Sequence, residues 1–191
     1  MAAVDSIVHD RRFGEEIQLA VRLQLEAGIR VRESMLVRAS QLLGLRVDSY
    51  TGELRGWIQV KGKGGMTYTT CMSRETYERL DAYLVAHGGM LRVPYHAYLR
   101  ALRDAARRTG QVASGKATHG LRWNRAQRRF REVSRVVGPE RAKRIVSAEM
   151  GHRRGEITTH YLSSRQRRAL RRRRRRRVPA KPRNTHGKRD T

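Results

Sequence analysis

Four short segments that lie far apart in the sequence carry side chains able to bind or react with phosphate. The first, GIRVRES, holds Arg30 and Glu33 three residues apart, and the second, VKGKGGM, is a glycine-rich turn that presents Lys63. A guanidinium group can bind two phosphoryl oxygens at once and stays charged, and an ammonium group on a turn can deliver a proton. These two segments suit the binding of a phosphate and the protonation of a leaving oxygen.

The other two segments add imidazoles, a second guanidinium and a hydroxyl. THGLRW places His119 and Arg122 three residues apart at the start of an expected helix, so both side chains point the same way. EMGHRRGEITTHYL places Tyr161 nine residues after His152. Imidazoles can move a proton, and a tyrosine hydroxyl can attack phosphorus. Each segment alone is more typical of an ion pair, a hairpin or a packing residue, but the four together favour phosphodiester chemistry.

The elements that must position these segments are mostly helical. The spacing of apolar residues predicts helices over 13–27, 30–39, 73–87, 99–106, 118–137 and 139–150. Between 45 and 72, β-branched and aromatic residues flank the turn signals TGE and KGKGG, which predicts a small antiparallel β-meander. We interpret Trp57, Tyr68 and Tyr77 as core residues, because they occupy amphipathic positions. The expected fold is α+β, mostly α-helical, with one small sheet between early and late helices.

Length and composition exclude several classes of protein. The 191 residues fit one domain, or one domain with a tail, and the apolar content permits a packed core. The single cysteine, Cys71, excludes an intrachain disulfide and a multi-cysteine zinc module. No stretch approaches the ~20 apolar residues of a membrane span. No carboxylate cluster of metal-binding type accompanies the four segments, so a metal-dependent nuclease is disfavoured. We expect a soluble protein of a reducing compartment.

The net charge of +26 favours a polyanionic partner, with nucleic acid the leading one. Residues 165–191 carry fourteen Lys and Arg against Asp190 alone, a net +13, which leaves +13 for residues 1–164. Such a block repels itself, so we expect a disordered or conditionally ordered tail. A solubility extension and generic nucleic-acid adhesion together form the alternative to a specific role. The tail arginines expected to contact nucleic acid are Arg165, Arg167, Arg168, Arg171, Arg172 and Arg173.

Taken in order, the four segments resemble the catalytic domain of tyrosine recombinases, the phage integrase family. Members of that family carry an Arg-x-x-Glu, a Lys in a β-turn, a His-x-x-Arg, a Gly-His and a nucleophilic Tyr a fixed short distance later. The resemblance covers about residues 27–162, and its specific part is THGLR followed by MGHRRGEITTHYL. The matching positions are Arg30, Glu33, Lys63, His119, Arg122, His152 and Tyr161.

The chain departs from the family pattern in three places. Trp123 follows the His-x-x-Arg where many members have a second His, and Met66 stands where a basic residue is common, but neither position is catalytic. The family's N-terminal DNA-clamping domain is missing ahead of Arg30, so the chain is either a natural single-domain member or a fragment of a longer integrase. We expect the catalytic domain over 1–164 and an Arg-rich basic tail over 165–191.

The resemblance implies roles that agree with the chemistry of the side chains. Tyr161 would form a covalent 3′-phosphotyrosine, which retains the bond energy, so that religation needs no nucleotide cofactor and no metal. Lys63 would be the general acid for the leaving 5′ oxygen. His119 and His152 would donate hydrogen bonds to the phosphate or handle the tyrosine proton.

The two arginines would stabilise charge on the non-bridging oxygens. Arg30 and Arg122 suit this task because their guanidinium groups bind oxygens in pairs and stay charged. Glu33 is expected to orient a basic residue. Arg32 is a rival for the role of Arg30, but only Arg30 has a Glu three residues later.

The resemblance implies the DNA breaking–rejoining enzyme fold and a site-specific recombinase or integrase of a bacterial or phage mobile element, acting in the cytoplasm. Such an enzyme would act on double-stranded DNA at paired sites, in a synaptic tetramer whose C-terminal segments reach a neighbour. The need for an accessory DNA-bending protein stays open. Two alternatives remain: a topoisomerase IB-like nicking–closing enzyme, and a non-catalytic basic protein that coats DNA or RNA.

Overall fold

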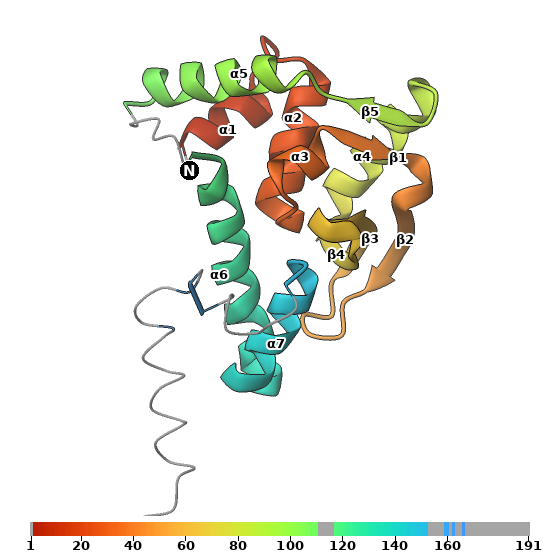
Figure 1. Cartoon of the computed structure of the whole chain (residues 1–191), viewed down its shortest axis with the longest axis vertical. Coiled ribbons are helices and arrows are strands. Elements are labelled where there is room, and N and C mark those ends of the chain that lie inside the picture. Colours follow the sequence, from red (N-terminus) through yellow and green to blue (C-terminus); the bar gives the residue numbers. More distant parts are fainter. Residues whose placement is uncertain (1, 111–116, 153–158, 161, 163–165, 167–191) are drawn as a thin grey trace, which may run out of the picture.

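The computed structural model describes residues 2–110, 117–152, 159, 160, 162 and 166 (Figure 1). Outside the described part lie Tyr161, the side chains of Lys63 and His119, and the tail arginines Arg165, Arg167, Arg168, Arg171, Arg172 and Arg173. Among the described residues, no helix is both long enough and apolar enough to span a membrane.

Short helices and short strands alternate in the first half of the chain, and longer helices fill the second half. In chain order the elements are α1 (Ala2–His9), α2 (Glu15–Arg22), the π-helical turn η1 (Leu23–Ala27), α3 (Val31–Ser34), β1 (Leu36–Arg38), the 3-10 turn η2 (Ala39–Gln41), β2 (Leu42–Val47), β3 (Leu54–Lys61), the 3-10 turn η3 (Lys63–Gly65), β4 (Thr67–Ser73), α4 (Arg74–Ala86), β5 (Met90–Arg92), α5 (Tyr95–Arg108), α6 (Ala117–Val137) and α7 (Pro139–Glu149). The fold is therefore α+β, as predicted.

The described strands form two antiparallel sheets rather than the one expected. The predicted meander is present in the order β2–β3–β4, with Lys61 paired to Thr67 beside the turn. β1 and β5 form a separate two-stranded sheet, in which Val37 pairs with Leu91. Figure 1 shows both sheets on one side of the molecule, with α5 lying along α1 on the other.

The prediction of a helix over 30–39 is wrong beyond its first turn. α3 is only four residues long, and the chain continues at once into β1. The buried Val37 of β1 faces the core, and its pairing with Leu91 of β5 decides the local structure. A short apolar run such as Met35–Leu36 fits both the helical and the strand period, so the spacing could not separate the two.

Most of the remaining helix ends follow their sequence signals. Ser73 caps α4, because the backbone N–H of Thr76 donates to its Oγ over 3.2 Å. Gly138, with a φ of 76°, separates α6 from α7, and Pro139 starts α7. The helix expected over 13–27 is present, but its last turn, η1, widens to a π-helix before the left-handed Gly28.

Apolar side chains gather in two clusters that meet at a polar boundary. The larger cluster joins α1, α2, η1, the strands, α4, α5 and Leu121 at the start of α6, and the smaller lies around Phe130 and Val146 of α6 and α7. The face of α6 toward the larger cluster carries three buried arginines at helical spacing, Arg122, Arg125 and Arg129, here called the arginine stripe. Across most of this boundary α6 is therefore held by guanidinium groups.

A buried ionic cluster around Arg129, the last arginine of the stripe, fixes the position of α7. Arg129, fully buried, binds Asp48 after β2 (Nη1 to Oδ2, 2.5 Å) and Glu149 at the end of α7 (Nη2 to Oε1, 2.8 Å). Burial opposes the charged form of both partners, but their hydrogen bonds prevail, raising the pKa of Arg129 and lowering that of Asp48. The cluster sets the position of Glu149, which directly precedes the Met150-Gly151-His152 segment of the site.

Candidate active site

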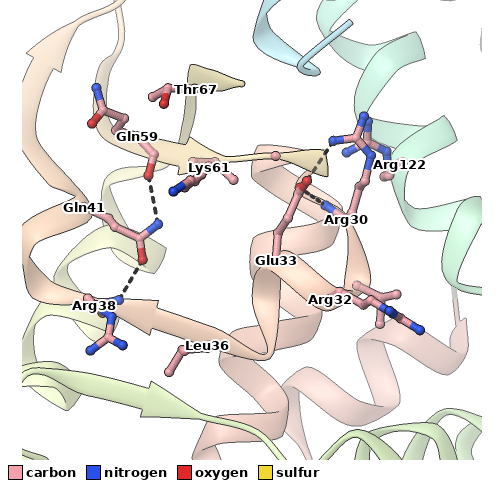
Figure 2. Close-up of a pocket in the computed structure, with 13 residues that line it drawn as sticks. Arg30, Arg32, Glu33, Leu36, Arg38, Gln41, Gln59, Lys61, Thr67 and Arg122 are labelled. Atoms are coloured by element: carbon pink, nitrogen blue, oxygen red, sulfur yellow. Dashed lines mark hydrogen bonds and ion pairs between the residues drawn. The ribbon is translucent and has the colours of Figure 1, made fainter. Parts of the chain in front are cut away.

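Arg30 is held by Glu33 through both its backbone and its side chain. Arg30 is the residue before α3, with extended backbone, rather than a residue on a helical face as the sequence predicts. Its backbone N–H donates to Glu33 Oε2 over 2.7 Å, and its Nη1 donates to Oε1 over 2.7 Å (Figure 2). The carboxylate thus closes the first turn of α3 and fixes the guanidinium at the same time.

Tyr68 of β4 supplies a further hydrogen bond to the same carboxylate. Its hydroxyl donates to Glu33 Oε2 over 2.6 Å, from a side chain that is only 7% exposed. Burial would raise the pKa of Glu33, but the hydrogen bonds from Tyr68 and Arg30 outweigh it and hold the pKa below its usual range. Burial and the adjacent carboxylate raise the pKa of Tyr68. Tyr68 is therefore a poor nucleophile despite its place beside the arginines.

Arg122 is fixed by backbone carbonyls at the ends of two helical segments. It is 3% exposed, and it donates from Nη1 to Gly28 O, at the end of η1, and from Nη2 to Met150 O, at the end of α7, over 2.9 Å. The carbonyl ends of helices carry partial negative charge, which suits a guanidinium group. Gly28 must be a glycine, because a Cβ there would lie 2.7 Å from Cγ of Arg125 and its φ is +69°.

His152 lies beside Arg122, with 3.4 Å between His152 Nε2 and Arg122 Nη2. Its backbone N–H donates to Ser147 O over 2.9 Å, which closes the turn at the end of α7. Burial and the positive charges of Arg122 and Arg30 lower the pKa of His152 to about 4. The imidazole is therefore neutral at pH 7. In that form it can accept a proton, which an imidazolium cannot do.

The site opens into a cavity of about 1020 Å³. Arg30, Glu33 and Arg122 lie at one end of it, and Lys61 and Arg38 line it farther along β3 and β1 (Figure 2). Gln41 lies at the other end, where its side chain donates to Gln59 O over 3.0 Å and accepts from Arg38 N over 2.8 Å.

Arg32, the rival of Arg30, also lines this cavity. The only ion pair of Glu33 within the described residues is with Arg30. The lining is rich in cationic groups and suits a phosphate-bearing ligand.

The structure thus brings together Arg30, Glu33, Arg122 and His152, which come from three of the four predicted segments. The fourth segment, the GKGG turn, begins beside Arg30: a β-carbon on Gly62 would lie 3.2 Å from Arg30 Nη1. The roles predicted for the side chains of Lys63 and His119 and for Tyr161 fall outside the described residues. Sequence reasoning missed the contribution of Tyr68, because nothing local marks a strand tyrosine as the partner of a carboxylate 35 positions earlier.

The part of the chain that the structure describes offers no ready set of side chains for binding a metal ion. Within those residues, no group of three or more His, Cys, Asp or Glu side chains could hold a metal ion. The polar groups at the site are instead guanidinium, imidazole, carboxylate and phenol groups. The carboxylate of Glu33 is occupied by hydrogen bonds from Arg30 and from Tyr68. The remaining guanidinium and imidazole groups are suited to binding an anion.

Comparisons with known proteins identify the fold. No protein-family model and no curated protein matches the chain. Among solved structures, the XerH site-specific recombinase bound to a palindromic difH substrate, a post-cleavage complex, matches with a TM-score of 0.63 and 14% identity over 89% of this chain and 49% of that chain. XerA recombinase matches with a TM-score of 0.57 and 17% identity over 91% of this chain and 63% of that chain.

A pre-cleavage complex of XerH with its difH substrate matches as well, with a TM-score of 0.58 and 14% identity over 88% of this chain and 50% of that chain. The chain therefore spans about half to two thirds of the length of these recombinases. The match extends over nearly all of the chain, so its fold is that of a tyrosine recombinase catalytic domain.

Proposed function

We propose that the chain is the catalytic domain of a tyrosine-type site-specific DNA recombinase. It would cleave and rejoin double-stranded DNA through a covalent 3′-phosphotyrosine on Tyr161, without metal or ATP. One observation carries the proposal: Arg30 and Arg122 lie at one end of a cation-lined cavity on a tyrosine recombinase fold, and His152 lies 3.4 Å from Arg122. These groups can stabilise the negative charge that develops on the oxygens of a pentacoordinate phosphorus.

The proposed reaction uses each group at a stated atom. Arg30 and Arg122 bind the non-bridging oxygens of the scissile phosphate, where negative charge grows as the hydroxyl oxygen of Tyr161 attacks phosphorus. The neutral His152 can accept the proton that Tyr161 loses. The bond from phosphorus to the 5′ oxygen breaks, and Lys63 gives that oxygen a proton. Attack of a 5′ hydroxyl on the phosphotyrosine reverses these steps and reseals the strand.

The remaining parts of the proposal concern partners. The net charge of +26 suits a DNA duplex, and the segment over 165–191 holds half of it. We propose a catalytic domain over 1–164, a DNA-contacting tail over 165–191 and a tetramer on synapsed DNA, with integration or excision of a mobile element as the outcome. His119, one turn before Arg122 on α6, is proposed to share the phosphate with His152.

A covalent trapping experiment tests the function. The protein would be incubated with a pool of nicked duplexes of randomised sequence, in which the short fragment released by cleavage diffuses away and prevents religation. A denaturant-resistant protein–DNA adduct is expected, with Tyr161→Phe as the matched control that binds DNA but forms none. Absence of an adduct would leave a basic coating protein. Recombination between two marked duplexes would separate a recombinase from a nicking–closing enzyme.

A further inference from the structure

Tyr68 touches three of the segments that build the site. Its hydroxyl donates to Glu33, the partner of Arg30, over 2.6 Å. Its ring lies against Gly151, which directly precedes His152, and against Gly62, which directly precedes the η3 turn. No other described tyrosine hydroxyl donates to a carboxylate. Tyr68 is thus a single side chain at the junction of α3, the end of α7 and the β3–β4 turn.

The ring of Tyr68 approaches the two glycines closely. A Cβ on Gly151 would lie 2.6 Å from Cδ1 and Cε1 of Tyr68, and one on Gly62 would lie 3.3 Å from Cε1. Gly151 also has a φ of +65°, which β-carbons disfavour, so no other residue fits there without a shift. The ring therefore fills the space that two glycines leave free, and the position of each backbone segment is set by the same aromatic side chain.

We propose that Tyr68 is a positioning residue: it holds the Glu33 carboxylate against Arg30 and thereby fixes the position of Arg30 relative to His152 and the β3–β4 turn. The inference rests on the proposed function of this site. Tyr68 does not contact substrate in this scheme, because its side chain is buried and its hydroxyl is committed to Glu33. It acts through the three segments that it joins.

The electrostatics of Glu33 give this role a measurable signature. The groups around the carboxylate are Arg30 beside it and Tyr68 from β4, with Arg122 of α6 and His152 after α7 at longer range. Removing the Tyr68 hydroxyl leaves the burial of Glu33 in place and deletes one of the donors that oppose it, so the pKa of Glu33 rises. A protonated Glu33 no longer pairs with Arg30. As the solution is acidified, a variant without the Tyr68 hydroxyl therefore loses activity at a higher pH than the wild type does.

The test is the pH profile of single-turnover cleavage by Tyr68→Phe. We expect the acid limb to move to higher pH by about one unit, with a rate within about threefold of the wild type at pH 8. Tyr77→Phe is the matched control. The hydroxyl of Tyr77, on α4, accepts from Gly44 N of β2 over 3.1 Å, and Tyr77 does not line the cavity, so this variant should follow the wild type.

Two further measurements separate the ways in which the proposal could fail. On a Glu33→Gln background, Tyr68→Phe should cause no further shift of the acid limb, because the titrating group is gone. A carbon-13 NMR titration of the Glu33 carboxyl in the free protein should give a higher midpoint in Tyr68→Phe than in the wild type. An unchanged midpoint or an unshifted profile would overturn the role of Tyr68. A raised midpoint in a protein that forms no DNA adduct would uphold the Tyr68–Glu33 coupling and reject the proposed function alone.

Discussion

The two arginines at the site are held in different ways, and this difference predicts different consequences of removing them. Arg30 is partly exposed and is held chiefly by one carboxylate, with a longer contact of 3.5 Å to Gly151 O, whereas Arg122 is buried and donates to two backbone carbonyls. Arg30→Ala should slow cleavage by about 10²–10³, as expected for the loss of one preorganised oxyanion donor. Arg122→Ala should slow it at least as much and should also lower the melting temperature, because it leaves two buried carbonyls without a donor.

Single-turnover rates and thermal melts of the two variants check this prediction. Arg32→Ala is the matched control, because Arg32 lines the same cavity and forms no ion pair with Glu33. A dead Arg32→Ala beside an active Arg30→Ala would reverse the assignment of the first catalytic arginine. Unchanged stability of Arg122→Ala would mean that water replaces its hydrogen bonds to Gly28 and Met150.

At the scale of elements, the β3–β4 turn carries the candidate general acid. η3 begins at Lys63, and Gly64 and Gly65 both have positive φ, so the turn geometry depends on glycine. Lys63→Ala should cleave ordinary DNA slowly, because an alkoxide leaves poorly without a proton. Replacing the bridging 5′ oxygen with sulfur should restore its rate strongly, because a thiolate, with a thiol pKa near ~8.5, leaves without protonation.

The arginine variants serve as the contrast in that experiment. Arg30→Ala and Arg122→Ala should gain little from the sulfur substitution, because their groups act on the non-bridging oxygens. Lys61→Ala, one strand position before Gly62 and lining the same cavity, controls for nonspecific loss of a nearby cation. Equal rescue of all variants, or none for Lys63→Ala, would remove Lys63 from the proposed mechanism.

The buried ionic cluster makes a prediction about stability. Arg129→Met removes the shortest ion pairs of the buried carboxylates of Asp48 and Glu149, which keep only longer contacts of 3.5 Å to Arg55 and Arg125, and should cost about 3–5 kcal/mol of unfolding free energy. Arg128→Met is a matched control at the preceding position of α6. The Arg128 side chain is partly exposed and lies 3.9 Å from Glu132, so its loss should cost less than about 1 kcal/mol. Urea unfolding of both variants measures the difference. Equal costs would show that the cluster does not stabilise the fold.

The sequence predicted the elements that have strong local signals and missed those decided by distant partners. Ser73 and Gly138-Pro139 mark helix ends through local chemistry, and the meander follows its turn glycines. β1 exists because β5 pairs with it, so its own residues could not reveal it. At the site, the spacing of Arg30 and Glu33 pointed to their pairing. The capture of Tyr68 by Glu33 depends on how β4 packs against α3, which no short spacing encodes.

At the scale of the whole molecule, charge is the dominant property. Deleting residues 165–191 removes a net +13 of the +26 and should weaken DNA binding about equally for all sequences. For every phosphate that the shortened chain no longer neutralises, the slope of log K against log salt should fall by ~0.9. Binding isotherms at several salt concentrations measure this slope for the full and the shortened chain. An identical slope would show that the tail does not bind DNA, and loss of strand exchange with intact cleavage would point to a contact between protomers.

The arginine stripe has a consequence for how such a molecule can be controlled. Arg30 and Glu33 belong to the side of the large apolar cluster, whereas Arg122 and His152 come from α6 and the end of α7. The boundary between them is bridged mostly by the directional hydrogen bonds and ion pairs of the arginine stripe, and Leu121 of α6 adds an apolar contact to the large cluster. A slight rocking of the α6–α7 pair would misalign the two guanidinium groups while both apolar clusters stay intact. If the proposed function is correct, cleavage would depend on the alignment of these two halves, and a change in that alignment would alter activity without unfolding either half.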